Sequence, residues 1–282
     1  MRFDQFKQDI LNRGTGKTTS QDPTASSPRL GLVYDFSKTV SIYTSVARGF
    51  RPNSGANFAG VAFVPEKSRS AEVGVKLETA DHKLSGTVAF YKTSKDNIIT
   101  NDPVNAGFTM AGGSAESQGL EIDASGELTK HLRVALSYAY TDAKITKEAV
   151  DVNGLGGIIH AGDHLINVPK NSANLLLIHD FKVNDSSFDV GAGVGYVGER
   201  QGETGFPSFK LPAYTLLKLV ASYAPSKKLK FTLNIENLLD KDYYPSSYAR
   251  EWVAPGTPRM VTLTANSKIG RASCRERVCQ YV

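Results

Sequence analysis

Most of this chain consists of short segments in which apolar and polar residues alternate. In the segment 131–141, every second residue from Leu132 to Tyr140 is apolar, while the residues between them are polar or small. The same alternation runs through 229–236. Because successive side chains of a strand point to opposite faces, a period of two predicts strands whose two faces meet different surroundings. About a dozen such segments, each of roughly 9–11 residues, are typical of a membrane β-barrel.

The composition agrees with this interpretation without requiring it. Hydrophobic residues make up 40% and charged residues 22% of the 282 residues, and barrels have such values because only every second strand residue faces lipid. No apolar run reaches about 18 residues, so transmembrane helices are excluded. The N-terminus has the pattern of a strand and not that of a signal peptide, so we expect Met1 to lie inside a longer polypeptide.

The last 15 residues break the strand pattern. They contain both cysteines, Cys274 and Cys279, and four of the basic residues. The segment KIGRASCRERV resembles the translation of a sequencing adapter, so we predict a barrel portion over 1–267 and a non-native tail over 268–282. The alternative is a basic Cys-x4-Cys metal or redox tail. Without the tail the chain holds 29 basic and 27 acidic residues, which gives no support to nucleic-acid binding.

The alternating segments predict twelve antiparallel strands, separated by short and long connections in turn. The strands are 2–12, 28–36, 39–49, 68–79, 84–95, 117–128, 131–143, 172–181, 188–199, 214–224, 229–238 and 258–267. The short connections are 37–38, 80–83, 129–130, 182–187 and 225–228, and the long ones are 14–27, 50–67, 96–116, 144–171, 201–213 and 239–257. This alternation is expected when tight turns face the periplasm and long loops face outward. A soluble β-sandwich would show turn signals without two classes of rim.

The pattern also predicts which face meets lipid. Gly191, Gly193 and Gly195 alternate with apolar residues, so we expect them to face the lumen, where another packed element needs space. A charge on the lipid face near the midplane would cost about 2–4 kcal/mol. The apolar set of residues contains almost no charged side chain. His179 is an exception, which a position near a strand end makes tolerable. Interfacial girdles are predicted from Tyr34, Phe36, Tyr138, Tyr140, Tyr196, Tyr223 and Phe231.

Some short motifs would indicate other chemistry, but the sequence around each of them does not fit the site that the motif forms elsewhere. The match to GxGxxG at 193–198 lies inside a predicted strand, whereas a dinucleotide site needs it to open a helix. The segment 16–18 lacks the glycine of a phosphate-binding loop. His160 and His164 lie in a Gly-rich loop and not on one helix face, so we interpret them as exposed loop residues and predict no metal site. No catalytic set is identifiable, and we predict that the protein is not an enzyme.

A series of strand and loop motifs covers residues 1–267. They are PRLGLVY (28–34), VSIY (40–43), ARGFRP (47–52), PEK (65–67), EVGVK (72–76), SQGLE (117–121), NVPK (167–170), YVGER (196–200), NIENLLDKDYY (234–244) and PGTPR (255–259). These motifs resemble those of TonB-dependent ferric-siderophore receptors, which lie in the outer membrane of Gram-negative bacteria. One departure is at the end, where the family's terminal aromatic would be expected at residue 269 and Ile269 stands instead.

The resemblance implies a barrel of 22 strands, monomeric at full length, whose lumen holds an N-terminal plug. This chain would be the C-terminal portion, about 12 strands forming a curved, incomplete barrel. The implied function is binding of a ferric siderophore at the outer vestibule and its import by active transport. The partners would be outer-membrane lipid and the TonB-ExbB-ExbD complex, reached through the missing plug region. No cofactor is expected, because iron is only part of the transported chelate.

Aromatic and cationic residues of the outer rim suit a bulky, often anionic chelate, because rings cover apolar surface and arginines meet oxygen donors. The predicted ligand-binding residues are Phe50, Arg51, Phe63, Tyr248, Arg250 and Trp252. The alternative for 48–51 is that it orders the rim. The alternative for Tyr243, Tyr244 and Arg259 is that they pack the last hairpin.

Three rival functions stay open. A passive porin would carry acidic and basic eyelet residues on an inward loop. A soluble carbohydrate-binding or adhesive β-protein would pack its apolar faces together. Within the receptor family, the cargo could be haem, cobalamin or a sugar.

Overall fold

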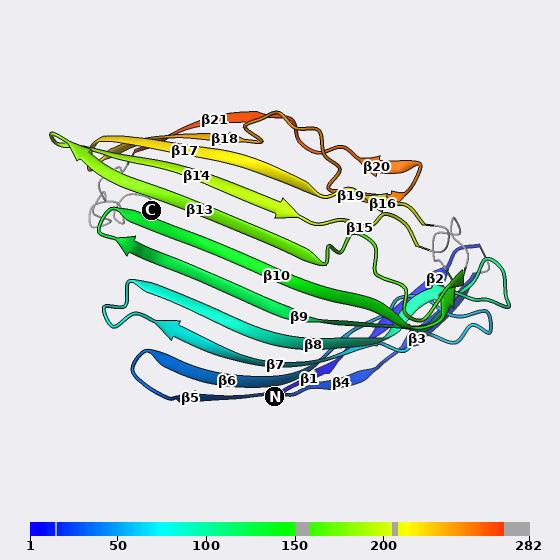
Figure 1. Ribbon diagram of the computed structural model, residues 1–282. Helices are drawn as coiled ribbons and strands as arrows, with labels where there is room; N and C mark the ends of the chain where they lie inside the picture. Colours follow the sequence, from blue (N-terminus) through cyan, green and yellow to red (C-terminus); the bar gives the residue numbers. More distant parts are fainter. Residues whose placement is uncertain (15, 151–157, 205–207, 268–282) are drawn as a thin grey trace, which may run out of the picture.

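The computed structural model describes all residues except 15, 151–157, 205–207 and 268–282, so the predicted tail lies outside the described residues. Its main feature is one strongly curved antiparallel sheet, in which eleven strands follow one another in the order of the sequence (Figure 1). These strands are β5 (Arg29–Asp35), β6 (Val40–Arg51), β7 (Glu66–Glu78), β8 (Leu84–Asn101), β9 (Thr109–Thr129), β10 (Leu132–Lys147), β13 (Asn171–Val183), β14 (Ser186–Val197), β17 (Tyr214–Ser226), β18 (Leu229–Glu236) and β21 (Met260–Ser267). The predicted all-β, incomplete barrel is confirmed.

Shorter strands lie at the ends of the long ones. They are β1 (Arg2–Gln5), β2 (Gln8–Asn12), β3 (Lys17–Gln21), β4 (Thr24–Ser27), β11 (Ala149–Val150), β12 (Ile158–Ile159), β15 (Arg200–Gln201), β16 (Lys210–Leu211), β19 (Ser246–Ala249) and β20 (Trp252–Ala254). Strands β11 and β12 join the main sheet, while the others form two-stranded pairs of their own.

The two rims of the sheet differ as the sequence predicts. Tight turns join β5 to β6, β7 to β8, β9 to β10, β13 to β14 and β17 to β18 at one rim. The longer connections 52–65, 102–108, 198–213 and 237–259 lie at the other rim, together with the short strands that they carry. Since tight turns face the periplasm in outer-membrane barrels, the loop-bearing rim is the outer one.

Several strands run well beyond the predicted ends. Strand β9 has 21 residues and β8 has 18, whereas crossing a bilayer takes about 9–11. The predicted loop 96–116 is therefore mostly strand. The predicted loop 14–27 is also wrong, because β3 and β4 occupy it and pair with β2 and β1. The predicted strand 2–12 is thus split in two and lies outside the main sheet.

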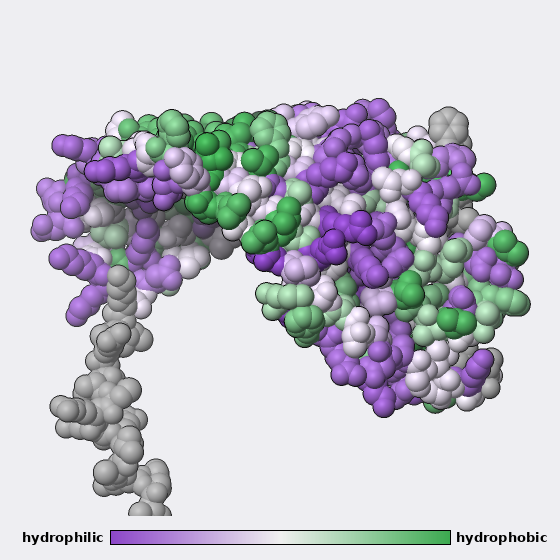
Figure 2. All heavy atoms as spheres, turned by 90° about the horizontal axis from the view of Figure 1, so that it is seen from below, coloured by the Kyte–Doolittle hydropathy of each residue, from purple (hydrophilic) through white to green (hydrophobic). Residues whose placement is uncertain are grey.

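Cross-strand pairing aligns the apolar residues into rows on the outer face of the sheet. One row crosses seven neighbouring strands, and each residue is opposite the next: Tyr34, Ile42, Val75, Val88, Ile122, Tyr138 and Ala173. Large members of this face are open to the surroundings; Val73 is 49% and Phe90 59% exposed. Nothing among the described residues covers them. Figure 2 shows the hollowed molecule from one side, with hydrophobic patches lying open on its surface. The apolar face is therefore a lipid-facing belt.

Among the described residues, none belongs to a helix long and apolar enough to cross a membrane.

The lumen-facing glycines have a different use from the expected one. A Cβ placed on Gly193 would lie 2.5 Å from Cε of Lys218, and one on Gly195 would lie 3.0 Å from Oδ1 of Asn174. Side chains of the neighbouring strands therefore fill the space beside these glycines. Gly74 likewise leaves space for the Tyr43 side chain, whose ring lies across it. The glycines let long polar side chains lie flat on the inner wall, so a separate packed element is not needed to explain them.

Candidate functional site

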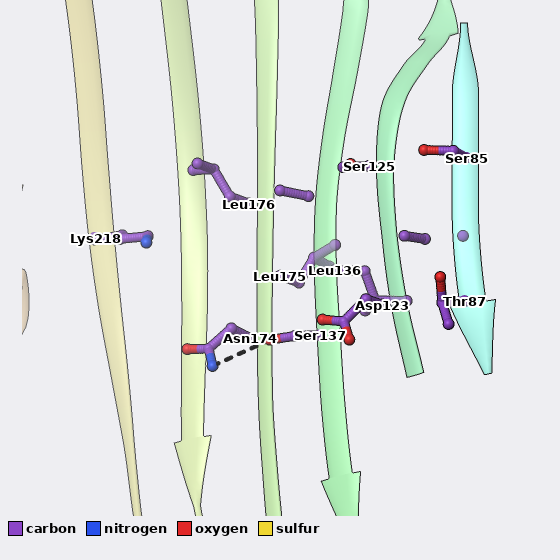
Figure 3. A pocket seen from close by; sticks show the side chains of 13 residues that line it. Ser85, Thr87, Asp123, Ser125, Leu136, Ser137, Asn174, Leu175, Leu176 and Lys218 are labelled. Atoms are coloured by element: carbon purple, nitrogen blue, oxygen red, sulfur yellow. Dashed lines mark hydrogen bonds between the residues drawn. The ribbon is translucent and has the colours of Figure 1, made fainter. Parts of the chain in front are cut away.

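The inner wall of the sheet carries a shallow hollow of about 390 Å³, which is lined by both polar and aliphatic residues. The side chains of Thr87, Asp123 and Lys218 are among those that line it (Figure 3). Nδ2 of Asn174 lies 3.5 Å from Oγ of Ser137 on the same wall. A hydroxyl, a carboxylate, an amide and an ammonium group in one hollow can hydrogen-bond a polar partner in the lumen.

At the outer rim, three connections are joined around Asn167 and Arg200, and we call this group the C-terminal rim cluster. Asn167 lies in the connection after β12, and its Nδ2 donates to the carbonyl of Ser247 at 2.8 Å. Its Oδ1 accepts from the Ser247 amide at 2.9 Å. Arg200 is only 3% exposed; it donates to the carbonyls of Gly198 and Tyr244 and lies over the Tyr214 ring at 5.1 Å. These contacts fix the base on which the last outer loop rests.

Arg250 and Glu203 form an ion pair that completes the C-terminal rim cluster. Nε of Arg250 lies 3.1 Å from Oε1 of Glu203, and the Arg250 amide also donates to this carboxylate at 3.2 Å. The hydrogen bonds from Arg250 lower the pKa of the Glu203 carboxyl below its usual value. Because this carboxylate is satisfied by Arg250, the charge that the pair presents outward is small.

An aromatic pair stands beside this ion pair. The rings of Tyr248 and Trp252 have centroids 5.8 Å apart, and they belong to the hairpin of β19 and β20. Trp252 is 58% and Tyr248 48% exposed. In β19, Tyr248 stands between the buried Ser247 and Ala249. An exposed aromatic pair on a rigid base is suited to bind a flat or apolar ligand surface.

The other three predicted site residues lie at the base of the connection 52–65. Arg51 pairs with Glu66, with Nη2 2.9 Å from Oε2. Phe63 is 7% exposed and packs against Gly55. Phe50 is opposite Lys67, two residues along β6 from Arg48, so the pleat places it on the outer face of the sheet while Arg51 is on the lumen face.

The structure thus groups Tyr248, Arg250 and Trp252 in one cluster and leaves Phe50, Arg51 and Phe63 in another. Asn53 organises the second group: its Nδ2 donates to the carbonyls of Val64 and Asn97 at 2.9 and 2.8 Å. The ring of Phe58 meets that of Phe108 edge-on at 5.0 Å. Ligand contact by the six residues stays a prediction.

Several motif residues are structural. The Tyr243 ring lies against Gly256 and within 4.7 Å of the Tyr214 ring, and the Arg259 amide donates to Asp240 at 2.7 Å. Asn237, with a φ of 47°, donates to the carbonyls of Lys241 and Thr257. These contacts support the alternative that Tyr243 and Arg259 pack the last hairpin.

Sequence reasoning passed over Arg200 and Asn167 as individual site residues. The only signal was their place in the YVGER and NVPK motifs, because neither spacing nor periodicity reveals a buried arginine. The histidines are in ion-pair range of carboxylates instead of one another, His164 with Asp142 at 3.6 Å and His160 with Glu148 at 3.5 Å. Within the described part of the chain, no group of three His, Cys, Asp or Glu residues could hold a metal ion.

Comparison with known proteins gives consistent matches. A family model described as TonB dependent receptor-like, beta-barrel matches residues 1–238. The metal-pseudopaline receptor CntO of Pseudomonas aeruginosa is 40% identical over 271 residues, 94% of this chain and 37% of that protein. The ferrichrome outer membrane transporter/phage receptor of Escherichia coli is 30% identical over 269 residues, 94% of this chain and 35% of that protein.

A solved structure agrees with these sequence matches. The siderophore receptor PiuA from Acinetobacter baumannii matches with a TM-score of 0.79 at 25% identity, over 94% of this chain and 39% of that one. This chain therefore spans little more than a third of the length of these three proteins.

Proposed function

Because this chain belongs to the TonB-dependent receptor β-barrel family, whose members lie in the outer membrane of Gram-negative bacteria, we propose that it is part of an importer of ferric siderophores. The observation that carries the proposal is the C-terminal rim cluster. There, the exposed Tyr248 and Trp252 rings stand over a base fixed by Arg200 and Asn167. Rings and guanidinium groups on a rigid base match a chelate that has apolar surface and anionic oxygens.

The cargo class follows from the relatives. A receptor of metal–pseudopaline is 40% identical to this chain, and a ferrichrome transporter is 30% identical. Both names describe small metal chelates, so we propose a metal chelate as cargo, with a ferric siderophore as the first candidate. The protein moves this cargo without covalent chemistry, and iron belongs to the cargo.

Transport through the lumen requires a partner on the inner wall. The hollow around Asp123 and Lys218 offers both signs of charge within one surface, so we propose that its polar groups hydrogen-bond the plug that the family resemblance implies. A plug held by hydrogen bonds can move when TonB pulls on it, whereas an apolar interface of the same area would resist exposure to water.

Uptake measurements test this function. The gene is deleted and restored in the host bacterium, and uptake of ⁵⁵Fe bound to hydroxamate, catecholate and carboxylate chelates is measured in each strain. We expect uptake of one chelate class to depend both on the gene and on TonB. Uptake that persists without TonB would favour the passive porin, and TonB-dependent uptake of haem, cobalamin or a sugar alone would replace the proposed cargo.

A further inference from the structure

Two arginines stand directly opposite each other on the outer face of the sheet. Arg48 of β6 pairs with Arg69 of β7 in the ladder, and both side chains are exposed. Like charges directly opposite each other destabilise an antiparallel pair. Within the described residues, neither side chain has a hydrogen bond or an ion pair. The pair is therefore a concentration of positive charge that no described residue neutralises.

The arginine pair lies at the upper edge of the lipid-facing belt. Arg48 is about ten residues beyond the tight turn before β6, which corresponds to roughly 26 Å for a strand rise of about 3.4 Å and a tilt of about 40°. The apolar band of an outer-membrane barrel is about 25 Å tall. Because the tight turns face the periplasm, the pair is level with the headgroups of the outer leaflet.

A hollow of about 420 Å³ joins the arginines to the apolar belt. Below them it is lined by Leu30, Val46 and Ala71, of which Leu30 is 64% and Val46 50% exposed. At its side is Lys92, whose Nζ lies 2.8 Å from Oε1 of Glu116.

Among the described residues, none of those that line this hollow is acidic. One surface therefore combines the two arginines above with aliphatic side chains below.

We propose that this hollow binds one outer-leaflet lipid whose headgroup carries phosphate. Its phosphate groups lie between the guanidinium groups of Arg48 and Arg69, which bind phosphate in a bidentate manner. Its acyl chains run down over Leu30 and Val46. The site is on the lipid face, on the opposite side of the sheet from the lumen hollow, and it does not depend on the proposed cargo.

Lipid retention tests the proposal. The protein is extracted from outer membranes in a mild detergent, as its host bacterium makes it. Bound lipid A, a phosphorylated glycolipid, is then counted by native mass spectrometry. We expect Arg48→Gln with Arg69→Gln to lower retention about tenfold. The matched control, Lys76→Gln with Lys230→Gln, removes two cations from the inner face and should leave retention unchanged. Unchanged retention in the arginine variant would overturn the proposal.

Two further measurements separate lipid binding from a free-anion site and from a purely structural role of the arginines. The unchanged protein should retain lipid A without phosphate groups as poorly as the arginine variant retains intact lipid A. Millimolar inorganic phosphate should not displace intact lipid A from the unchanged protein. Displacement by phosphate alone would show a free-anion site and would overturn the lipid assignment. In lipid-free detergent the arginine variant should unfold at the same or a higher temperature, because it loses the repulsion. A lower temperature would instead show that the arginines serve the fold.

Discussion

Arg250 donates hydrogen bonds to the carboxylate of Glu203, and this contact joins two outer loops that are 47 residues apart in the sequence. The two side chains differ in burial, since that of Glu203 is 13% exposed and that of Arg250 is 55% exposed. Nearly buried carboxylates are stable as ions only when a partner of opposite charge holds them. The pair therefore keeps the last outer loop close to the connection after β15.

This pair predicts a pH-dependent outer loop. The folded-state pKa of Glu203 is lowered, so its contribution to stability is present above the unfolded value of about 4.3 and is lost as the pH falls through the folded value. Relative to the intrinsic exchange rate at each pH, amide hydrogen exchange of 246–254 should therefore speed up below about pH 4. The variant Arg250→Gln should show the faster exchange already at pH 7. Equal exchange in both proteins at pH 7 would show that the pair contributes nothing.

The assignment of the two faces predicts opposite results for neighbouring substitutions. Leu175 pairs with Leu136 and Val194 on the outer face, while Leu176 pairs with Ala135 and Gly193 on the inner face. We expect Leu175→Arg to cost about 2–4 kcal/mol because it places a charge in lipid. The matched control Leu176→Arg meets water and should cost much less. Urea unfolding in lipid vesicles measures both free energies, and equal costs would disprove a lipid-facing belt.

Two inner-wall glycines should differ in their tolerance of a methyl group. A Cβ on Gly191 would lie 2.8 Å from the carbonyl oxygen of Leu177, whereas one on Gly193 first meets the end of the Lys218 side chain. A lysine can swing into the lumen, but a paired backbone cannot move away. Gly191→Ala should therefore lower the free energy of unfolding by about 1–3 kcal/mol, and Gly193→Ala by less. The reverse order would contradict the proposed difference between the two positions.

The aromatic pair of the rim predicts a specific loss of cargo binding. Removing the exposed Trp252 ring by Trp252→Ala should weaken binding of the transported chelate about tenfold, because its large apolar surface is lost. Phe90→Ala removes an equally exposed ring from the lipid face and serves as the control. Tryptophan fluorescence is lost with the only Trp, so calorimetry is the suitable measurement. Equal affinities in the two variants would remove Trp252 from the site.

The sequence predicted the strands correctly where the two faces of the sheet meet different surroundings. From β13 to β18 the alternation located the strands because one face meets lipid and the other the lumen. Above the membrane both faces meet water, so the pattern fades. This is why the sequence predicts loops at β3, at β4 and at the outer ends of β8 and β9. The sequence could not predict which of the site residues lie close together in space. The Tyr248 and Trp252 contact depends on an irregular pairing between β19 and β20, and the burial of Arg200 depends on three loops meeting.

The order of strands in the sheet limits how a ring can be completed. Eleven strands joined only by antiparallel pairs make the two border strands, β5 and β21, run in the same direction. A fully antiparallel ring therefore needs an odd number of further strands. A second copy of this sheet would bring eleven, but in the same membrane orientation each seam would join two strands of equal direction. Self-association in the membrane would thus seal the wall only through two parallel seams, whereas a polypeptide of complementary direction at both borders completes a fully antiparallel ring.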